Sequence, residues 1–244
     1  MVAEGQEWSV LTWNIQGAKH TDLDRLAEVI SAATIDVVVL QEVRRSQADG
    51  LAQRLSMQHT WAKKHHPSQP LFPDRAEGAA ILTPHELSNA GHQRISDAQS
   101  KRSYRRRVIQ WATVSRADAT GYRVYNAHLS PHDATRERHN EARRISSIVA
   151  AHGSAPPAII AGDLNDSNDP LVVATLPGIE AIASPATSPS EQPVQPLDHV
   201  LVPAAAAGVS VSAPAGGREW AELSDHLPLT VRFTLDWVSN GFGS

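Results

Sequence analysis

The sequence predicts an α/β protein, in which buried strands alternate with amphipathic helices. Two runs, Val37–Leu40 and Ala158–Ala161, have no polar alternation, as expected of strands covered on both faces. Residues 23–30 carry apolar side chains at i, i+3, i+4 and i+7, which form one stripe of a helix. A chain of 244 residues can bury a large core. We expect one domain over residues 1–244, with the tail 236–244 left unassigned.

Composition limits the kinds of site that the chain can hold. The net charge of −4 and pI near 6.3 exclude a globally basic nucleic-acid binder but allow a local basic patch. The chain has no cysteine, so a metal would need oxygen ligands or histidine, which favours hard divalent cations. No segment approaches the ~18 apolar residues of a membrane span, and the N-terminus lacks a targeting pattern. We expect a cytoplasmic protein.

The elements of the N-terminal half follow from apolar runs and turn residues. Strands are expected at Trp8–Trp13, Val37–Leu40, Gln58–Ala62, Ala79–Leu82 and Val108–Val114. Helices are expected after Thr21, which can cap the first, and over residues 48–55. The segment Ala62–Arg75 has three prolines and no apolar periodicity, so we expect a long surface loop, with Lys63–His66 as a solvated rim.

The C-terminal half continues the pattern. Strands are expected at Tyr122–Ala127, Ala158–Ala161, Leu197–Val202 and Leu229–Leu235. A helix is expected over Ala134–Ala151, and Asp169–Pro170 suits the start of another. Pro177–Pro196 contains five of the sixteen prolines, and we interpret it as a loop because the strands that follow are too few for a second domain.

Polar side chains stand at six strand ends, where catalytic groups are commonly held by a rigid scaffold. They are Asn14, Glu42, His128, Asp163 with Asn165, Asp198, and Asp225 with His226. Asn14 alone could be a turn former, and Asp163 with Asn165 could be an Asx-turn. Packing does not explain Glu42 at the tip of a buried strand, because carboxylates are seldom buried without a partner. Together these residue types indicate a cleft for a divalent cation and a phosphate.

A basic run precedes one of the expected strands. Five of the seven residues from Lys101 to Arg107 are basic. The run is either a solvated face or a patch that contacts phosphates, with Tyr104 available to stack.

The strand-end motifs resemble those of the endonuclease/exonuclease/phosphatase superfamily. These metal-dependent phosphoesterases include deoxyribonuclease I, exonuclease III and the neutral sphingomyelinases. The matching motifs, in order from Val10 to Phe233, are Leu11-Thr12-Trp13-Asn14, Val39-Leu40-Gln41-Glu42, Asn126-Ala127-His128-Leu129, Gly162-Asp163-Leu164-Asn165, Leu197-Asp198-His199-Val200 and Ser224-Asp225-His226-Leu227-Pro228.

The resemblance implies a fold and a set of roles. The fold is a four-layer α/β/β/α sandwich of two packed mixed β-sheets with helices on the outer faces. Metal binding is implied for Glu42, Asn14 and Asp225, and catalytic roles for His226, Asp198, Asp163, Asn165 and His128. Asp163 and Asn165 would position or activate water, His226 would pair with Asp198, and His128 would touch the phosphate. Substrate contacts are expected from Asn126, Arg102, Arg105 and Arg106.

The function implied is Mg²⁺-dependent phosphoester hydrolysis by a monomer, with Mn²⁺ able to substitute. Nuclease action on DNA or RNA is the first hypothesis, a phosphatase or sphingomyelinase-like esterase the second, and a catalytically silent binding module the third. His128 stands where exonuclease III-type repair enzymes have tyrosine, which disfavours abasic-site repair. The absence of cysteine separates the chain from disulfide-bonded secreted deoxyribonucleases. Endo- or exonuclease action, one or two metals, and Asp163 or His226 as general base stay open.

Overall fold

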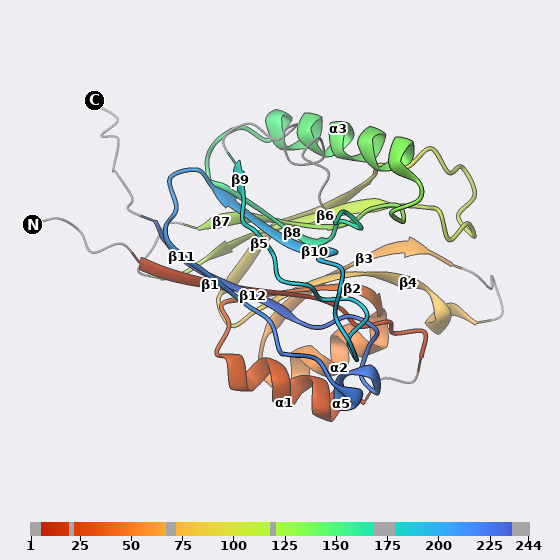
Figure 1. Cartoon of the computed structure of the whole chain (residues 1–244). Helices are drawn as coiled ribbons and strands as arrows, with labels where there is room; N and C mark the ends of the chain where they lie inside the picture. The colour runs from red at the N-terminus through yellow and green to blue at the C-terminus, as the bar shows by residue number, and fades with distance from the viewer. Residues whose placement is uncertain (1–5, 20–21, 67–71, 118–120, 168–178, 236–244) are drawn as a thin grey trace, which may run out of the picture.

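The computed structural model describes residues 6–19, 22–66, 72–117, 121–167 and 179–235. Two six-stranded mixed sheets pack face to face, and helices cover their outer faces (Figure 1). Helices α1 (Leu23–Ala33) and α2 (Arg45–Leu55) lie against the first sheet, and α3 (Thr135–Ala151) lies against the second. The predicted four-layer α/β/β/α sandwich is confirmed.

Each sheet mixes strands from distant parts of the sequence. The first has the order β11-β12-β1-β2-β4-β3, from Ala207–Ser212, Leu229–Leu235, Gln6–Asn14, Val37–Arg44, Glu77–Thr83 and Gln58–His65. The second has the order β5-β6-β7-β8-β10-β9, from Glu86–Arg94, Val108–Ser115, Tyr122–His128, Ala158–Asp163, Asp198–Pro203 and Ile179–Ala181. Two short helices, η1 (Pro73–Arg75) and α5 (Arg218–Ala221), lie in the connections.

Strand direction brings the predicted strand ends to one edge. β1 runs parallel to β2, and β7 runs parallel to β8. β10 is antiparallel to β8, so that Asp198 lies opposite Asp163. β12 is antiparallel to β1, which places its start beside the end of β1. Apolar side chains of both sheets fill the space between them and hold these ends in place.

Several expected boundaries were wrong. The strand predicted to end at Ala62 continues to His65, and Lys64, His65 and His66 are buried instead of forming a solvated rim. The His66 amide donates to the Lys101 carbonyl, so the segment before β6 covers this end of β3. The N-cap of α1 is Asp22, whose carboxylate accepts from the amides of Asp24 and Arg25.

Some expectations fall where the structure describes nothing. Thr21, the Asp169–Pro170 helix start and the tail 236–244 lie outside the described residues. The proline-rich segment contains β9 and an isolated bridge between Ser188 and Gln195. None of the described helices is long and apolar enough to cross a membrane.

Candidate active site

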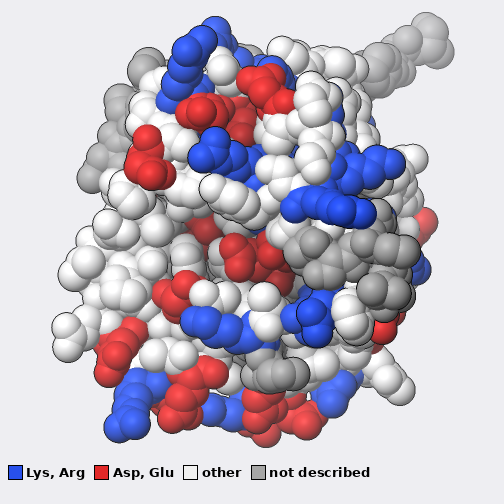
Figure 2. Space-filling view, turned by 90° about the vertical axis from the view of Figure 1, so that its right-hand side faces the viewer, with Lys and Arg blue, Asp and Glu red and all other residues white. Residues whose placement is uncertain are grey.

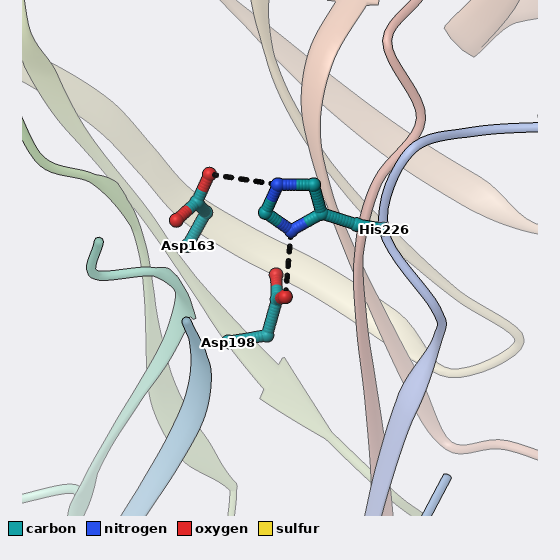
Figure 3. A group of neighbouring side chains, drawn as sticks. All are labelled: Asp163, Asp198 and His226. Carbon is teal, nitrogen blue, oxygen red and sulfur yellow. Dashed lines mark hydrogen bonds and ion pairs between the residues drawn. The ribbon is translucent and has the colours of Figure 1, made fainter. Parts of the chain in front are cut away.

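His226 lies between two carboxylates at the edge where the sheets meet (Figure 3). Its Nδ1 is 2.7 Å from Asp198 Oδ2, and its Nε2 is 3.9 Å from Asp163 Oδ2. Thr187 Oγ1 donates to the same Asp198 oxygen at 2.6 Å. The Trp13 indole N–H donates to the His226 carbonyl at 2.8 Å, which anchors the segment before β12 to β1. The imidazole is therefore held in one orientation.

The charge of His226 follows from this placement. Burial lowers the pKa of the imidazole, but Asp198 and Asp163 outweigh that effect and raise the pKa to about 10. His226 is consequently an imidazolium at neutral pH, and its Nε2 forms an ion pair with Asp163 at a distance longer than a hydrogen bond.

Asp163 is fixed through both carboxylate oxygens. Asn14 Nδ2 donates to Oδ2 at 3.1 Å, and the backbone amide of Asn165 donates to Oδ1 at 3.0 Å. The preceding Gly162 has φ +150°, and a Cβ there would lie 1.8 Å from the Ala127 carbonyl oxygen. Only glycine therefore fits this close approach to the neighbouring strand β7. Burial is the largest cause of the raised pKa of Asp163, which makes it a stronger base than an exposed aspartate.

Glu42 is turned toward the other carboxylates by a bulge in β2. The register shifts between Gln41 and Val43, and Glu42 has φ +53°. Burial raises the pKa of its carboxyl, Glu77, Asp163 and Asp225 add to the effect, and Lys64 opposes it. The carboxylates outnumber the cations near Glu42, and such a gathering is costly unless a further cation binds.

Two groups of residues could hold that cation. Glu42, Asn14 and Asp225 offer only oxygen ligands, with Asp225 held by Gln16 Nε2 at 2.9 Å. Asp163, Asp198 and His226 also offer ligand atoms within 4.8 Å of one another. Each group has an oxygen that is already used: Asn14 Oδ1 accepts from the Gln16 backbone amide at 3.1 Å, and Asp198 Oδ2 accepts from Thr187 and contacts His226. The first group differs in offering only oxygen atoms, which hard divalent cations prefer.

His128 lies opposite Asp163 in the β7–β8 pair and faces the same carboxylates. Its Nε2 is 3.6 Å from Asp163 Oδ2 and 4.0 Å from Glu42 Oε1. Burial, followed by the nearby Lys64 and Arg107, lowers its pKa well below the usual value. His128 is therefore neutral at pH 7, and these contacts are not ion pairs.

A cleft of about 330 Å³ contains most of these groups. Figure 2 shows this face, with acidic side chains gathered in a hollow near its centre and basic side chains around it. Three charged or imidazole side chains in the lining were not indicated by the sequence: Lys64, His65 and Glu77. Lys64 Nζ donates to Glu77 Oε1 at 2.6 Å. Arg107, which also lines the cleft, belongs to the basic run for which phosphate binding is one interpretation.

Asn126 does not lie in the cleft lining, contrary to its expected contact with substrate. It is 1% exposed, and its Nδ2 donates to the carbonyls of Leu40 and Ala80 across the two sheets. Its Oδ1 accepts from Gln41 Nε2 at 3.0 Å. The amide is occupied by these bonds, so the structure gives it a role in joining the sheets.

The basic run is divided by the structure. Arg107 is buried and lines the cleft, whereas Arg102 and Arg105 are exposed and Arg106 is half-buried. Arg105 Nε donates to the Tyr104 hydroxyl, and the carboxylates of Glu137 and Asp133 contribute to the electrostatic field at its guanidinium. The structure therefore does not place all three predicted arginines in one cationic surface along the cleft.

Comparison with known families settles which group the chain falls in. The model of the Endonuclease/Exonuclease/phosphatase family matches residues 11–226. The chain belongs to this family. Members of the family are phosphoester hydrolases that generally depend on divalent metals, and the acidic and imidazole groups described above fit that chemistry.

Solved structures support the fold of this family member. A Bacteroides vulgatus endonuclease/exonuclease/phosphatase is similar at 18% identity and TM-score 0.76, over 94% of this chain and 99% of that one. Truncated Caenorhabditis elegans TDP2 gives 19% identity and TM-score 0.70, over 93% and 97%. A Bacteroides thetaiotaomicron mannosyl-6-phosphatase gives 17% and 0.68, over 93% and 99%. The search of curated proteins found no match.

Proposed function

We propose that this chain is a divalent-metal-dependent phosphoesterase in which water attacks phosphorus in line. The observation that carries the proposal is the convergence of Glu42, Asp163 and His226 from both sheets into one cleft. A catalytically silent module would keep these buried and half-buried charges at a cost in stability, with no ligand to compensate them.

We expect a divalent cation to bind oxygen atoms from the end of β1, the bulge in β2 and the segment before β12. Glu42, Asn14 and Asp225 would hold Mg²⁺ or Mn²⁺, which would supply Lewis-acid stabilisation of charge on the phosphoryl and leaving oxygens. No part of this assignment needs a thiol or a histidine cluster.

Asp163 is the better candidate for general base. Both of its oxygens are oriented by Asn14 and Asn165, and burial raises its pKa. His226 is already protonated beside Asp198, so it would donate from Nε2 to negative charge that develops on the phosphate. Neutral His128 would donate from Nε2 to a second phosphate oxygen.

Two substrate classes fit this chemistry. Nucleic acid is supported by Tyr104, which lines the cleft and is 64% exposed, and by Lys101 and Arg102, which are exposed and nearby in the sequence. A small phosphorylated molecule is supported by the carboxylates of Asp133 and Glu137 near Arg105, which would repel a nucleic-acid backbone. Similarity in fold to a mannosyl-6-phosphatase is consistent with the second class.

A screen tests the proposed activity directly. Purified protein with Mg²⁺ or Mn²⁺ is assayed on plasmid, single-stranded DNA, RNA, sphingomyelin and inositol phosphates, with and without chelator. We expect hydrolysis of at least one phosphate ester, lost in chelator and restored by excess metal. Full turnover in excess chelator would end the metal assignment.

The nuclease hypothesis has its own test. In the variant Arg102→Gln/Arg105→Gln/Arg106→Gln, removing each phosphate-binding charge would lower the slope of log affinity against log salt by about 0.7 to 0.9. A nuclease that follows the backbone should lose affinity on all sequences alike. An unchanged slope would identify these arginines as a solvated face. Lys19→Gln, which removes an exposed charge outside the basic run, is the control.

A further inference from the structure

Two buried cations line the cleft beside its carboxylates. Lys64 and Arg107 are 6% and 3% exposed, with Lys64 near the end of β3 and Arg107 directly before β6. Burial and then Arg107 lower the pKa of Lys64, so the two side chains repel each other. Like charges this deeply buried are costly unless an anion lies against them.

The protein compensates this pair only in part. Glu77 accepts one hydrogen bond from the Lys64 ammonium, which has three donors. Arg107 Nη1 donates to the Tyr104 carbonyl at 2.7 Å, while Arg107 Nε is buried and has no hydrogen-bond partner among the described residues. Because this Nε is itself buried, a bound anion would contact the rest of the guanidinium, which lines the cleft.

The cleft is walled behind these cations. The His66 amide donates to the Lys101 carbonyl at 2.9 Å, and the Ile95 amide donates to the Arg107 carbonyl at 3.0 Å. The Arg107 amide donates to Ser96 Oγ at 2.9 Å. A phosphate lying against Lys64 and Arg107 would therefore have protein behind it. Its ester substituent would point out of the cleft past the exposed Tyr104.

We propose that Lys64 and Arg107 form a binding site for a terminal phosphate group, so that the substrate of this chain is a phosphomonoester. A monoester carries roughly one more negative charge at neutral pH than a diester, because its second pKa is about 6. The second cation matches that additional charge. The inference rests on the proposed phosphoesterase function and narrows its substrate class.

The first test compares two matched esters. With Mg²⁺ and the wild-type protein, kcat/KM for para-nitrophenyl phosphate should exceed that for bis(para-nitrophenyl) phosphate by about tenfold or more, since one charge-assisted contact contributes that much. Inorganic phosphate should compete with the monoester. Equal kcat/KM for the two esters would overturn the inference and leave the phosphoesterase proposal standing.

Substitutions locate the effect. Arg107→Gln, and the double variant Lys64→Gln/Glu77→Gln that removes both charges of the ion pair together, should each lower kcat/KM for the monoester about ten- to hundredfold. The diester value should change by less than about threefold, which is the effect expected from removing a neutral hydrogen bond. Arg138→Gln is the control, because Arg138 is buried and also has an unpartnered Nε but lies outside the cleft lining.

Further experiments distinguish loss of folding from loss of phosphate binding and identify the molecule that carries the phosphate group. If Arg107→Gln does not fold, Arg107→Lys, which keeps the charge, should retain most of the monoester preference, and loss of the preference would count against the inference. Release of phosphate from a 5′-phosphorylated oligonucleotide or from a sugar phosphate identifies which molecule presents the group. If no ester is hydrolysed, the proposed function fails. Calorimetric binding of inorganic phosphate, weakened by Arg107→Gln and not by Arg138→Gln, then still decides the inference.

Discussion

A histidine held between two aspartates is the group on which the proposed chemistry depends most. Asp198 contacts one imidazole nitrogen at 2.7 Å, and Asp163 lies beyond the other. Because Asp198 acts only through His226, His226→Ala, Asp198→Ala and the double variant should lose similar amounts of rate, on the order of a hundredfold or more. Single-turnover rates on the best substrate of the screen measure this.

The control for that cycle lies next to it. Thr187→Val removes the hydroxyl that contacts Asp198 and should cost less than either catalytic variant, while Thr187→Ser should keep the wild-type rate. If the losses in His226→Ala and Asp198→Ala simply add in the double variant, the two residues act separately.

At the residue scale, the sequence indicated the polar and charged residues that directly follow apolar runs. A carboxylate or imidazole after an apolar run, as at Asp163 or His128, is visible without a structure. Lys64 and Arg107 are not, because they stand among other basic residues and are buried only through the packing of the segment before β6 on β3. Burial of that kind depends on tertiary contacts that no local pattern records.

Among the elements, β7 connects the two sheets through one buried amide. Asn126 bonds to carbonyls of β2 and β4 and to the side chain of Gln41. Asn126→Ala would leave buried polar groups unpaired and should lower the free energy of unfolding by about 2 to 4 kcal/mol. Denaturant midpoints measure the loss.

A matched variant of β6 controls for the loss of a buried polar group as such. Thr113 is buried and its Oγ1 has no hydrogen-bond partner among the described residues. Thr113→Val should therefore leave stability unchanged or raise it. If Asn126→Ala is as stable as Thr113→Val, the amide does not join the sheets.

The central strands could be predicted, whereas of the four edge strands only β3 was predicted. β2 and β8 are buried on both faces and appear as continuous apolar runs. β5 and β11 lie at the sheet edges and are mostly exposed, so neither contains an apolar run, and the alternation in β11 covers only Val209–Ser212. Among the described residues, the short strand β9 pairs with β10 alone, and such pairing depends on tertiary contacts.

On the scale of the whole molecule, a divalent cation bound at Glu42 would relieve the repulsion between carboxylates of the two sheets. Glu42 comes from the first sheet and Asp163 from the second, and their carboxylates raise one another's energy in the absence of a cation. A cation that binds only the folded state stabilises it by about 2.7 kcal/mol at a hundred times its dissociation constant. For a chain of this length we expect Mg²⁺ to raise Tm by about 5 to 10 °C.

Glu42→Gln should make the order of stability between variant and wild type depend on Mg²⁺, because it removes both a metal ligand and a source of repulsion. In chelator the variant should melt at or above the wild-type temperature, and in Mg²⁺ it should melt below it, with a higher metal concentration at half-maximal shift. Scanning calorimetry at matched ionic strength measures both, and Glu28→Gln, an exposed glutamate on α1, controls for loss of charge alone. An equal rise of Tm with Mg²⁺ in the wild type and in Glu42→Gln would move the metal away from Glu42, toward the group formed by Asp163, Asp198 and His226.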